Sequence, residues 1–246
     1  MRAREREHPD EDQHAEDLGD VMSRAARQLQ EEHDDVEATL QAITTLAVAT
    51  VPNAEECSIS YVIGRKQVEP RASTSELPGK VDALQGEIGQ GPCLDAVWEN
   101  EVVRVDDVGA DDRWPQFAAR ASAVGVGSMM CFQLFVSGDR LGALNLYART
   151  PEAFDDECQE IARMFAAHAA VALAGAQHEE NLRKSVDSRD LIGQAKGILM
   201  ERHRLTADQA FGVLARASQE VNRKLVDVAR ELSETGAVPV PVKRRA

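Results

Sequence analysis

Residues 127–149 read "GSMMCFQLFVSGDRLGALNLYAR", and this stretch decides the fold class of the chain. Its two apolar runs flank the segment Ser137-Gly138-Asp139, whose residues suit a tight turn between antiparallel strands. The stretch therefore predicts a β-hairpin, and with it an antiparallel sheet.

Two other segments predict strands for the same sheet. Residues 57–63, "CSISYVI", alternate in polarity and are rich in β-branched and aromatic side chains. Residues 102–108, "VVRVDDV", indicate a shorter strand with an acidic end. All the predicted strands thus lie in the middle of the chain.

Helical patterns lie on both sides of these strands. Apolar residues recur at three- and four-residue steps from about 20 to 50, which predicts one helix that Pro52 ends. Residues 113–124 indicate a short helix, and the segment from Thr150 opens a helix of about thirty residues. We therefore expect an α+β domain whose antiparallel sheet is covered on one face.

The charge of the chain is divided unevenly. Residues 1–180 hold 15 Lys and Arg against 34 Asp and Glu, whereas residues 181–246 hold 13 against 8. The first part has a net charge of −19 and the second of +5, within an overall −14. A basic C-terminal module behind an acidic body favours a polyanionic partner for that module.

The C-terminal module has the pattern of three short helices. "TADQ" at 206–209 is a capping box, with Thr206 as the cap and Gln209 three residues later. Gly236 and Pro239 mark the end of the third helix. The apolar positions expected to form its small core are Leu191, Ile192, Ala195, Ile198, Leu199, Ala210, Val213, Leu214, Ala217, Leu225, Val228, Ala229 and Leu232, with Phe211 at the edge.

Two glycines stand inside the first of these helices, in "LIGQAKGILM". At 100° per residue Gly193 and Gly197 lie opposite the predicted core, with Arg189 and Lys196 beside them. Each glycine costs the helix roughly 1 kcal/mol relative to alanine. Either the glycines admit a closely packed neighbouring helix and Lys196 is simply solvated, or they admit a nucleic-acid strand.

Several ordered motifs of the first part resemble a GAF domain of the actinobacterial type. They are "GEIGQGPCLDAV" (86–97), residues 103–134 from "VRVDDVGADDRW" onward, and residues 139–173 from "DRLGALNLYAR" onward. The resemblance covers about residues 35–175. It implies a sensory module that binds a small molecule between sheet and loops and dimerises through its flanking helices.

The last part, "DSRDLIGQAKGILMERHRLTADQAFGVLARASQEVNRKLVDVARELSET", resembles an ANTAR domain over its whole length. The resemblance implies a three-helix module that binds hairpins in nascent RNA and prevents terminators from forming. Ala215 and Val226 depart from the family pattern, because relatives often have a charged residue there. The RNA-binding positions that the resemblance implies are Arg189, Gln194, Lys196, Arg202, Arg216, Ser218, Asn222, Arg223 and Lys224.

No motif of the chain indicates catalysis or metal binding. Nucleophile elbows, P-loops and zinc-protease motifs are absent from the sequence. We interpret "GEIGQG" (86–91) as a flexible loop, with a nucleotide-binding loop as the alternative, and the aspartates of 106–114 as turn-forming acids, with a metal site as the alternative. We interpret His168 as a satisfied, partly buried residue, with a metal or haem ligand as the alternative. The four cysteines are expected in the core, with redox sensing by Cys93 as the alternative.

These observations lead to four expected segments: a disordered tail (1–19), a GAF-like domain (20–177), an ANTAR-like RNA-binding domain (178–238) and a basic tail (239–246). We expect a non-enzymatic, cytoplasmic homodimer that does not enter membranes, since no long apolar run is present. RNA hairpins and a small molecule are the expected partners, and no cofactor or ligand-binding residue is assigned. The alternative is a DNA-binding or protein-interaction regulator with a small-molecule sensor.

Overall fold

The computed structural model describes residues 18–31, 35–63, 67–135 and 140–239. The chain forms two compact units, Met1–His178 and Glu179–Ala246, which are described in turn. The tails predicted at 1–19 and 239–246 lie almost wholly outside the described residues. None of the helices described is long and apolar enough to cross a membrane.

The first unit is built on a five-stranded sheet in the order β2-β1-β5-β4-β3, and every pairing is antiparallel. The predicted hairpin is confirmed, because β4 and β5 pair from Ser128 opposite Ala148 to Phe135 opposite Leu141. Its turn lies outside the described residues. The strands are β1 (Glu56–Ile63), β2 (Gln67–Ser73), β3 (Val102–Val105), β4 (Ser128–Phe135) and β5 (Arg140–Ala148).

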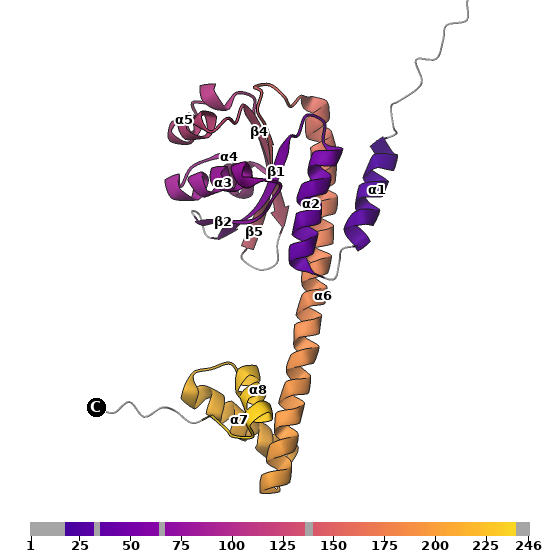
Figure 1. Cartoon of the computed structure of the whole chain (residues 1–246), viewed down its shortest axis with the longest axis vertical. Coiled ribbons are helices and arrows are strands. Elements are labelled where there is room, and N and C mark those ends of the chain that lie inside the picture. Colours follow the sequence, from indigo (N-terminus) through magenta and orange to yellow (C-terminus); the bar gives the residue numbers. More distant parts are fainter. Residues whose placement is uncertain (1–17, 32–34, 64–66, 136–139, 240–246) are drawn as a thin grey trace, which may run out of the picture. The chain divides into compact units, whose positions relative to one another are not determined.

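Helices cover both faces of this sheet, so the prediction of one covered face is wrong (Figure 1). α2 (Val36–Thr50) and the first half of α6 (Asp156–His203) pack on one face, and α1 (Leu18–Glu31) packs against α2 on the side away from the sheet. α3 (Glu76–Ile88), α4 (Pro92–Asp95) and α5 (Pro115–Ala123) pack on the other. The serines of β1 alternate with apolar residues as a one-sided strand would, yet Ser58 and Ser60 are fully buried.

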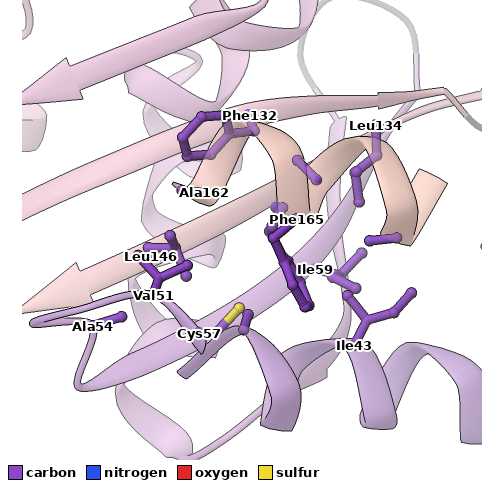
Figure 2. Packing of buried hydrophobic residues seen from close by; sticks show 14 of the residues in the cluster. Ile43, Val51, Ala54, Cys57, Ile59, Phe132, Leu134, Leu146, Ala162 and Phe165 are labelled. Carbon is purple, nitrogen blue, oxygen red and sulfur yellow. The ribbon is translucent and has the colours of Figure 1, made fainter. Parts of the chain in front are cut away.

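The larger hydrophobic core lies between the sheet and α2 and α6. Figure 2 shows the side chains that meet there, among them Ile43 of α2, Ile59 of β1, Phe132 of β4 and Phe165 of α6. All four are at most 2% exposed. Burying one such side chain contributes roughly 1.5–3 kcal/mol, so this core fixes the position of α6 on the sheet.

Three of the predicted elements differ in the structure. The single helix of 20–50 is two helices, because Asp35 has extended backbone and caps α2 by accepting a hydrogen bond from the Glu37 N–H. Residues 86–88 of the predicted loop form the last turn of α3, which Gly89 ends in the left-handed conformation. The strand predicted at 102–108 ends at Val105, and a turn of 3₁₀ helix (η2, Val108–Ala110) follows.

The second unit contains the last part of α6, α7 (Ala207–Val221) and α8 (Leu225–Thr235). The predicted capping box is confirmed: Thr206 Oγ1 accepts from the Gln209 N–H, and Gln209 Oε1 accepts from the Thr206 N–H. Gly236 ends α8 in the left-handed conformation, as expected. The buried core consists of Ala195, Leu199, Ala210, Leu214, Ala217, Val228, Ala229 and Leu232.

The long helix α6 runs through 48 residues without interruption, including Gly175, Gly193 and Gly197. It supplies Phe165 to the core of the first unit and Leu199 to the core of the second. The fold is therefore an α+β domain joined by a long helix to a small three-helix bundle.

Candidate functional site

The second unit has an open helix face around Gly193 and Gly197. A Cβ atom placed on either glycine would have no heavy atom within 4 Å among the described residues, apart from the backbone of α6 itself. The core residues Ala195 and Leu199 lie on the opposite side of the helix. Among the described residues, no neighbouring helix therefore packs closely against these glycines.

Two cations border the open face. Arg189 is exposed and Lys196 is half-buried, and helix geometry places both within about 60° of Gly193. Within the part of the chain that the structure describes, no salt bridge joins either side chain to a carboxylate. Gln194 is exposed as well, but it lies on the other side of α6 from Lys196.

Three of the nine expected RNA-binding residues form contacts within the module. The Arg202 guanidinium donates to the carbonyl oxygen of Gly236, which joins the last turn of α6 to the end of α8. Ser218 Oγ donates to the Arg223 carbonyl at 2.5 Å, and Arg223 pairs with Glu231 of α8. These contacts close the turns between the helices.

The remaining candidates lie at and before the turn from α7 to α8. Asn222 has left-handed backbone, with φ of 52°, and its N–H caps α7 through the carbonyls of Ser218 and Gln219. Lys224 is the residue before α8 and is exposed, as is Arg216 on α7. The candidates therefore form no single patch, since they occupy at least two sides of the bundle.

Sequence reasoning misplaced two side chains of α7. Val213 was assigned to the core but is 37% exposed, and Phe211 was assigned to the core edge but is 44% exposed. Neither belongs to the hydrophobic cluster or to the residues packed against it. The signal that was available is the glycine between them, because Gly212 leaves that part of α7 without a side chain to cover its neighbours.

The first unit holds a second candidate site, a buried polar cluster around Asp82 of α3. Its carboxylate accepts hydrogen bonds from Ser58 Oγ at 2.7 Å, Ser60 Oγ at 2.5 Å, Asn145 Nδ2 at 3.0 Å and Tyr147 OH at 2.5 Å. All five residues are at most 1% exposed. Burial raises the pKa of the Asp82 carboxyl, and the hydrogen bonds from Ser60, Tyr147, Ser58 and Asn145 oppose that shift. The cluster fastens α3 to strands β1 and β5.

Two buried side-chain atoms, one on α3 and one on β5, have no hydrogen-bond partner among the described residues. They are Nε2 of Gln85, a donor, and Oδ1 of Asn145, an acceptor. Buried polar atoms without partners are rare in folded proteins, because each one carries an uncompensated desolvation cost. An unpaired donor and an unpaired acceptor in one buried layer are the features that a small polar ligand would satisfy.

Two contacts of Gln85 explain the motif "GQGPC" at residues 89–93. Gln85 Oε1 accepts from the Cys93 N–H at 2.8 Å, so the glutamine amide lies directly beneath this loop. Gly91 has φ of 148°, and a Cβ there would lie 2.7 Å from Cγ of Gln85. Only glycine fits at this position, for both reasons.

The cysteines behave as core residues, as predicted. All four are buried and free. Burial raises the pKa of the Cys93 thiol far above its ordinary value, and the negative charge of Asp82 adds to this shift. Because the thiolate is the reactive form, the redox reading of Cys93 loses its chemical basis.

The acidic loop and His168 have structural roles. Asp107 Oδ1 accepts from the N–H groups of Gly109 and Ala110, and Asp111 accepts from the Arg113 N–H, so these aspartates order turns as expected. His168 is exposed rather than partly buried, and its Nδ1 lies 2.8 Å from the Met164 carbonyl. No group of three or more metal-ligating side chains occurs within the described ranges.

Family comparisons match both units. The first unit is an α+β domain with a buried polar cluster, and the second is a three-helix module with an open face that two cations border. The chain belongs to the GAF domain family, whose model matches residues 33–174. An ANTAR domain follows at residues 180–232, so the protein is a regulator of the GAF–ANTAR type.

Solved structures show the same fold at low sequence identity. The GAF domain of an Acinetobacter phosphoenolpyruvate-protein phosphotransferase is 14% identical with a TM-score of 0.52, over 68% of this chain and 99% of that one. A bacteriophytochrome from R. palustris is 13% identical with a TM-score of 0.56, over 85% of this chain and 48% of that one. At these identities the likeness concerns the fold alone. No curated protein matches the chain at a significant level.

Proposed function

We propose that this protein is a signal-responsive transcription antitermination regulator that binds hairpins in nascent RNA through its ANTAR domain, under the control of its GAF domain. The observation that carries this proposal is the ANTAR match over a face of α6 where Gly193 and Gly197 are uncovered beside Arg189 and Lys196. No packing contact within the described residues explains the two glycines in this helix. Their presence therefore favours a site where another molecule approaches the helix backbone closely. A cytoplasmic location belongs to the proposal, because nascent transcripts are there.

RNA hairpins suit the chemistry of this face. Hairpin loops display unstacked bases, whereas the major groove of an RNA duplex is too narrow for side chains to read. A few cations beside a smooth glycine surface would hold phosphates close to the helix backbone. The modest positive charge of the module suits a short hairpin better than a long duplex.

The test is anisotropy binding of the full-length protein to an RNA with two tandem hairpins. Scrambled-loop RNA and a DNA duplex of the same sequence are the nucleic-acid controls, and each titration is done at two salt concentrations. Lys196→Ala should weaken hairpin binding and reduce the salt dependence by about one phosphate contact. Lys80→Ala is the matched control, because Lys80 is an exposed lysine on α3 of the GAF domain.

The alternative class of function makes a different prediction in the same assay. A DNA-binding regulator would prefer the duplex, and a protein-interaction module would bind none of the three nucleic acids. Transcription in vitro across an intrinsic terminator then tests antitermination itself. We expect more read-through with the wild-type protein than with Lys196→Ala, and equal read-through would contradict the proposal.

Control by the GAF domain is the second part of the proposal. Its support is the buried layer between α3 and the sheet, where Gln85 Nε2 and Asn145 Oδ1 lack partners among the described residues. A small polar molecule that entered this layer would find an unpaired donor and an unpaired acceptor. Gln85→Leu removes the unpaired donor, and Asn145→Leu removes the unpaired acceptor. The measurement compares the RNA affinity of each variant with that of the wild type in the presence of cell metabolite extract.

A homodimer is the third part of the proposal. Between Arg163 and His178, the exposed stripe of α6 in the GAF unit consists of small, uncharged residues, Ala167, Val171 and Ala174. A hollow of about 390 Å³ between α1 and α6 borders it on one side, and one of about 290 Å³ beside β3 and β4 borders it on the other. A two-fold contact sets the same surface against itself, which an uncharged face tolerates and a like-charged face does not. Two ANTAR domains in one dimer would engage two hairpins and gain from avidity.

A further inference from the structure

Phe211 is an uncovered aromatic side chain on the ANTAR domain. It is the one aromatic residue between positions 179 and 246 of the sequence. In the structure it is 44% exposed, outside the core cluster and outside the apolar residues packed against that cluster. An unpacked phenylalanine contributes little to the stability of so small a bundle, so folding alone does not account for it.

The neighbours of Phe211 leave its ring accessible. The residues one turn before and one turn after it on α7 are Ala207 and Ala215, which carry no atoms beyond Cβ. The next residue, Gly212, has no side chain, and a Cβ there would meet no described atom within 4 Å. Longer side chains at these three positions would fold over the ring and shield it.

A polar residue lies on the same side of the helix. At 100° per residue, Ser218 falls within about 20° of Phe211 along α7. The Ser218 hydroxyl is committed to the Arg223 carbonyl. This side of α7 therefore offers the exposed aromatic ring of Phe211 as a contact.

We infer that Phe211 is a base-stacking residue of the ANTAR domain, which receives one unpaired loop base of the RNA hairpin. Aromatic side chains recognise splayed loop bases in this way, because every base presents a π-face. The inference rests on the proposed RNA-binding function and adds to it a contact that carries no charge.

The uncharged nature of the contact gives it a distinct signature. Loss of a phosphate contact lowers affinity and also lowers the salt dependence of binding, whereas loss of a stacking contact lowers affinity alone. Phe211→Leu should therefore weaken hairpin binding about tenfold and leave the slope of log affinity against log salt unchanged. Lys196→Ala should change that slope.

The experiment is a double-mutant cycle with the full-length protein and the tandem-hairpin RNA. Phe211→Leu is combined with RNAs in which each loop base in turn is replaced by an abasic site. Phe211→Tyr retains the ring and should bind like the wild type. Val213→Ala is the matched control, because Val213 is 37% exposed on the far side of α7. Circular dichroism during heating shows whether each variant folds.

Each possible outcome of this experiment either supports or overturns the assignment of Phe211 as a base-stacking residue. It is supported if one abasic position abolishes the difference between wild type and Phe211→Leu, since the ring then has no base to stack on. If Phe211→Leu binds hairpin RNA as tightly as the wild type, the stacking inference is overturned, but the RNA-binding function is not. Failure of the wild-type protein to distinguish hairpin from scrambled loops would overturn the proposed function as well. A shift of Phe211→Leu from dimer to monomer in light scattering would instead show that the ring contacts a second copy, and would also overturn it.

Discussion

At the scale of single residues, the glycines of this chain fall into two physical kinds. Gly91 adopts φ of 148° and lies against the Gln85 amide, so the fold itself requires it. Gly193 and Gly197 are helical, and nothing described lies near the place of their missing Cβ atoms. The first kind serves folding, and we assign the second to contact with another molecule.

This difference predicts opposite effects of alanine on stability. Gly193→Ala and Gly197→Ala should each raise the free energy of unfolding by up to about 1 kcal/mol, because alanine favours helix and meets no steric obstacle. Both should weaken hairpin RNA binding, because a methyl group would stand where the strand approaches. Gly91→Ala should lower the unfolding free energy. Thermal unfolding and RNA anisotropy of the same preparations measure both effects, and unchanged RNA affinity in the stabilised variants would contradict our assignment of the open face.

Asp82 predicts a dependence of stability on pH. Burial raises its pKa in the folded state above the ordinary value of 3.8. Its contribution to stability is therefore fully present below that ordinary value, and it is lost as the pH rises through the higher, folded-state pKa. Carboxylates with lowered pKa, such as Glu87 beside Arg120, change stability in the opposite direction.

Comparison with Asp82→Asn isolates the one group. The unfolding free energy of the wild type, relative to Asp82→Asn, should fall as the pH rises above the ordinary carboxyl pKa of 3.8, since only the wild type must charge the buried group. Urea unfolding at several pH values gives this difference. A wild type that gains on the variant over the same range would show that the four hydrogen bonds outweigh burial.

At the scale of helices and turns, basic side chains that look alike in sequence have different tasks. Arg202 fastens the end of α6 to the carbonyl of Gly236, at the end of α8. Lys196 forms no salt bridge within the described residues and borders the open face. The sequence marks both only as cations of the ANTAR pattern.

Substitutions of these two cations should have different effects on the free energy of unfolding. Arg202→Ala removes a hydrogen bond between helices and should lower the unfolding free energy by about 1 kcal/mol. Lys196→Ala should leave it unchanged and reduce RNA affinity. Arg202→Lys is the control, because a lysine retains the charge. If Arg202→Ala retains full stability and loses RNA binding, the clamp interpretation is wrong and Arg202 is an RNA contact.

At the scale of the whole molecule, the uncharged face of α6 in the GAF unit is the surface that we assign to the dimer. Val171 is 75% exposed there, beside the hollow that α1 and α6 form. Val171→Glu would set two carboxylates against each other across a two-fold axis. The wild type should be a dimer in size-exclusion chromatography with light scattering, and this variant a monomer.

A charge placed elsewhere on the same unit should have no such effect. Val124, at the end of α5, is 43% exposed and lies on the helices of the opposite sheet face. Val124→Glu should therefore remain a dimer. If the wild type is a monomer at micromolar concentration, the homodimer is wrong; if both variants are dimers, the contact lies on another surface.

The sequence by itself determined what depends on neighbours along the chain. The hairpin of 127–149, the capping box at Thr206 and the end of α8 at Gly236 were all readable, because turn and cap chemistry acts over a few residues. The order of the GAF and ANTAR domains came instead from the resemblance of their motifs to the two families. The nine expected RNA-binding residues came from resemblance, and no observation yet tests their contact with RNA.

The tertiary structure decided which side chains have partners. It buried Ser58 and Ser60 against Asp82, joined Arg202 to Gly236, and left Phe211 and the glycines of α6 uncovered. Residues that meet in these contacts are separated by 22 to 34 positions in the chain. The local sequence pattern does not predict contacts between residues so far apart in the chain, because burial and pairing depend on which elements the fold brings together. For that reason the sequence indicated two domains and their order, and only the folded chain separated cations that hold the module together from those that are open to a partner.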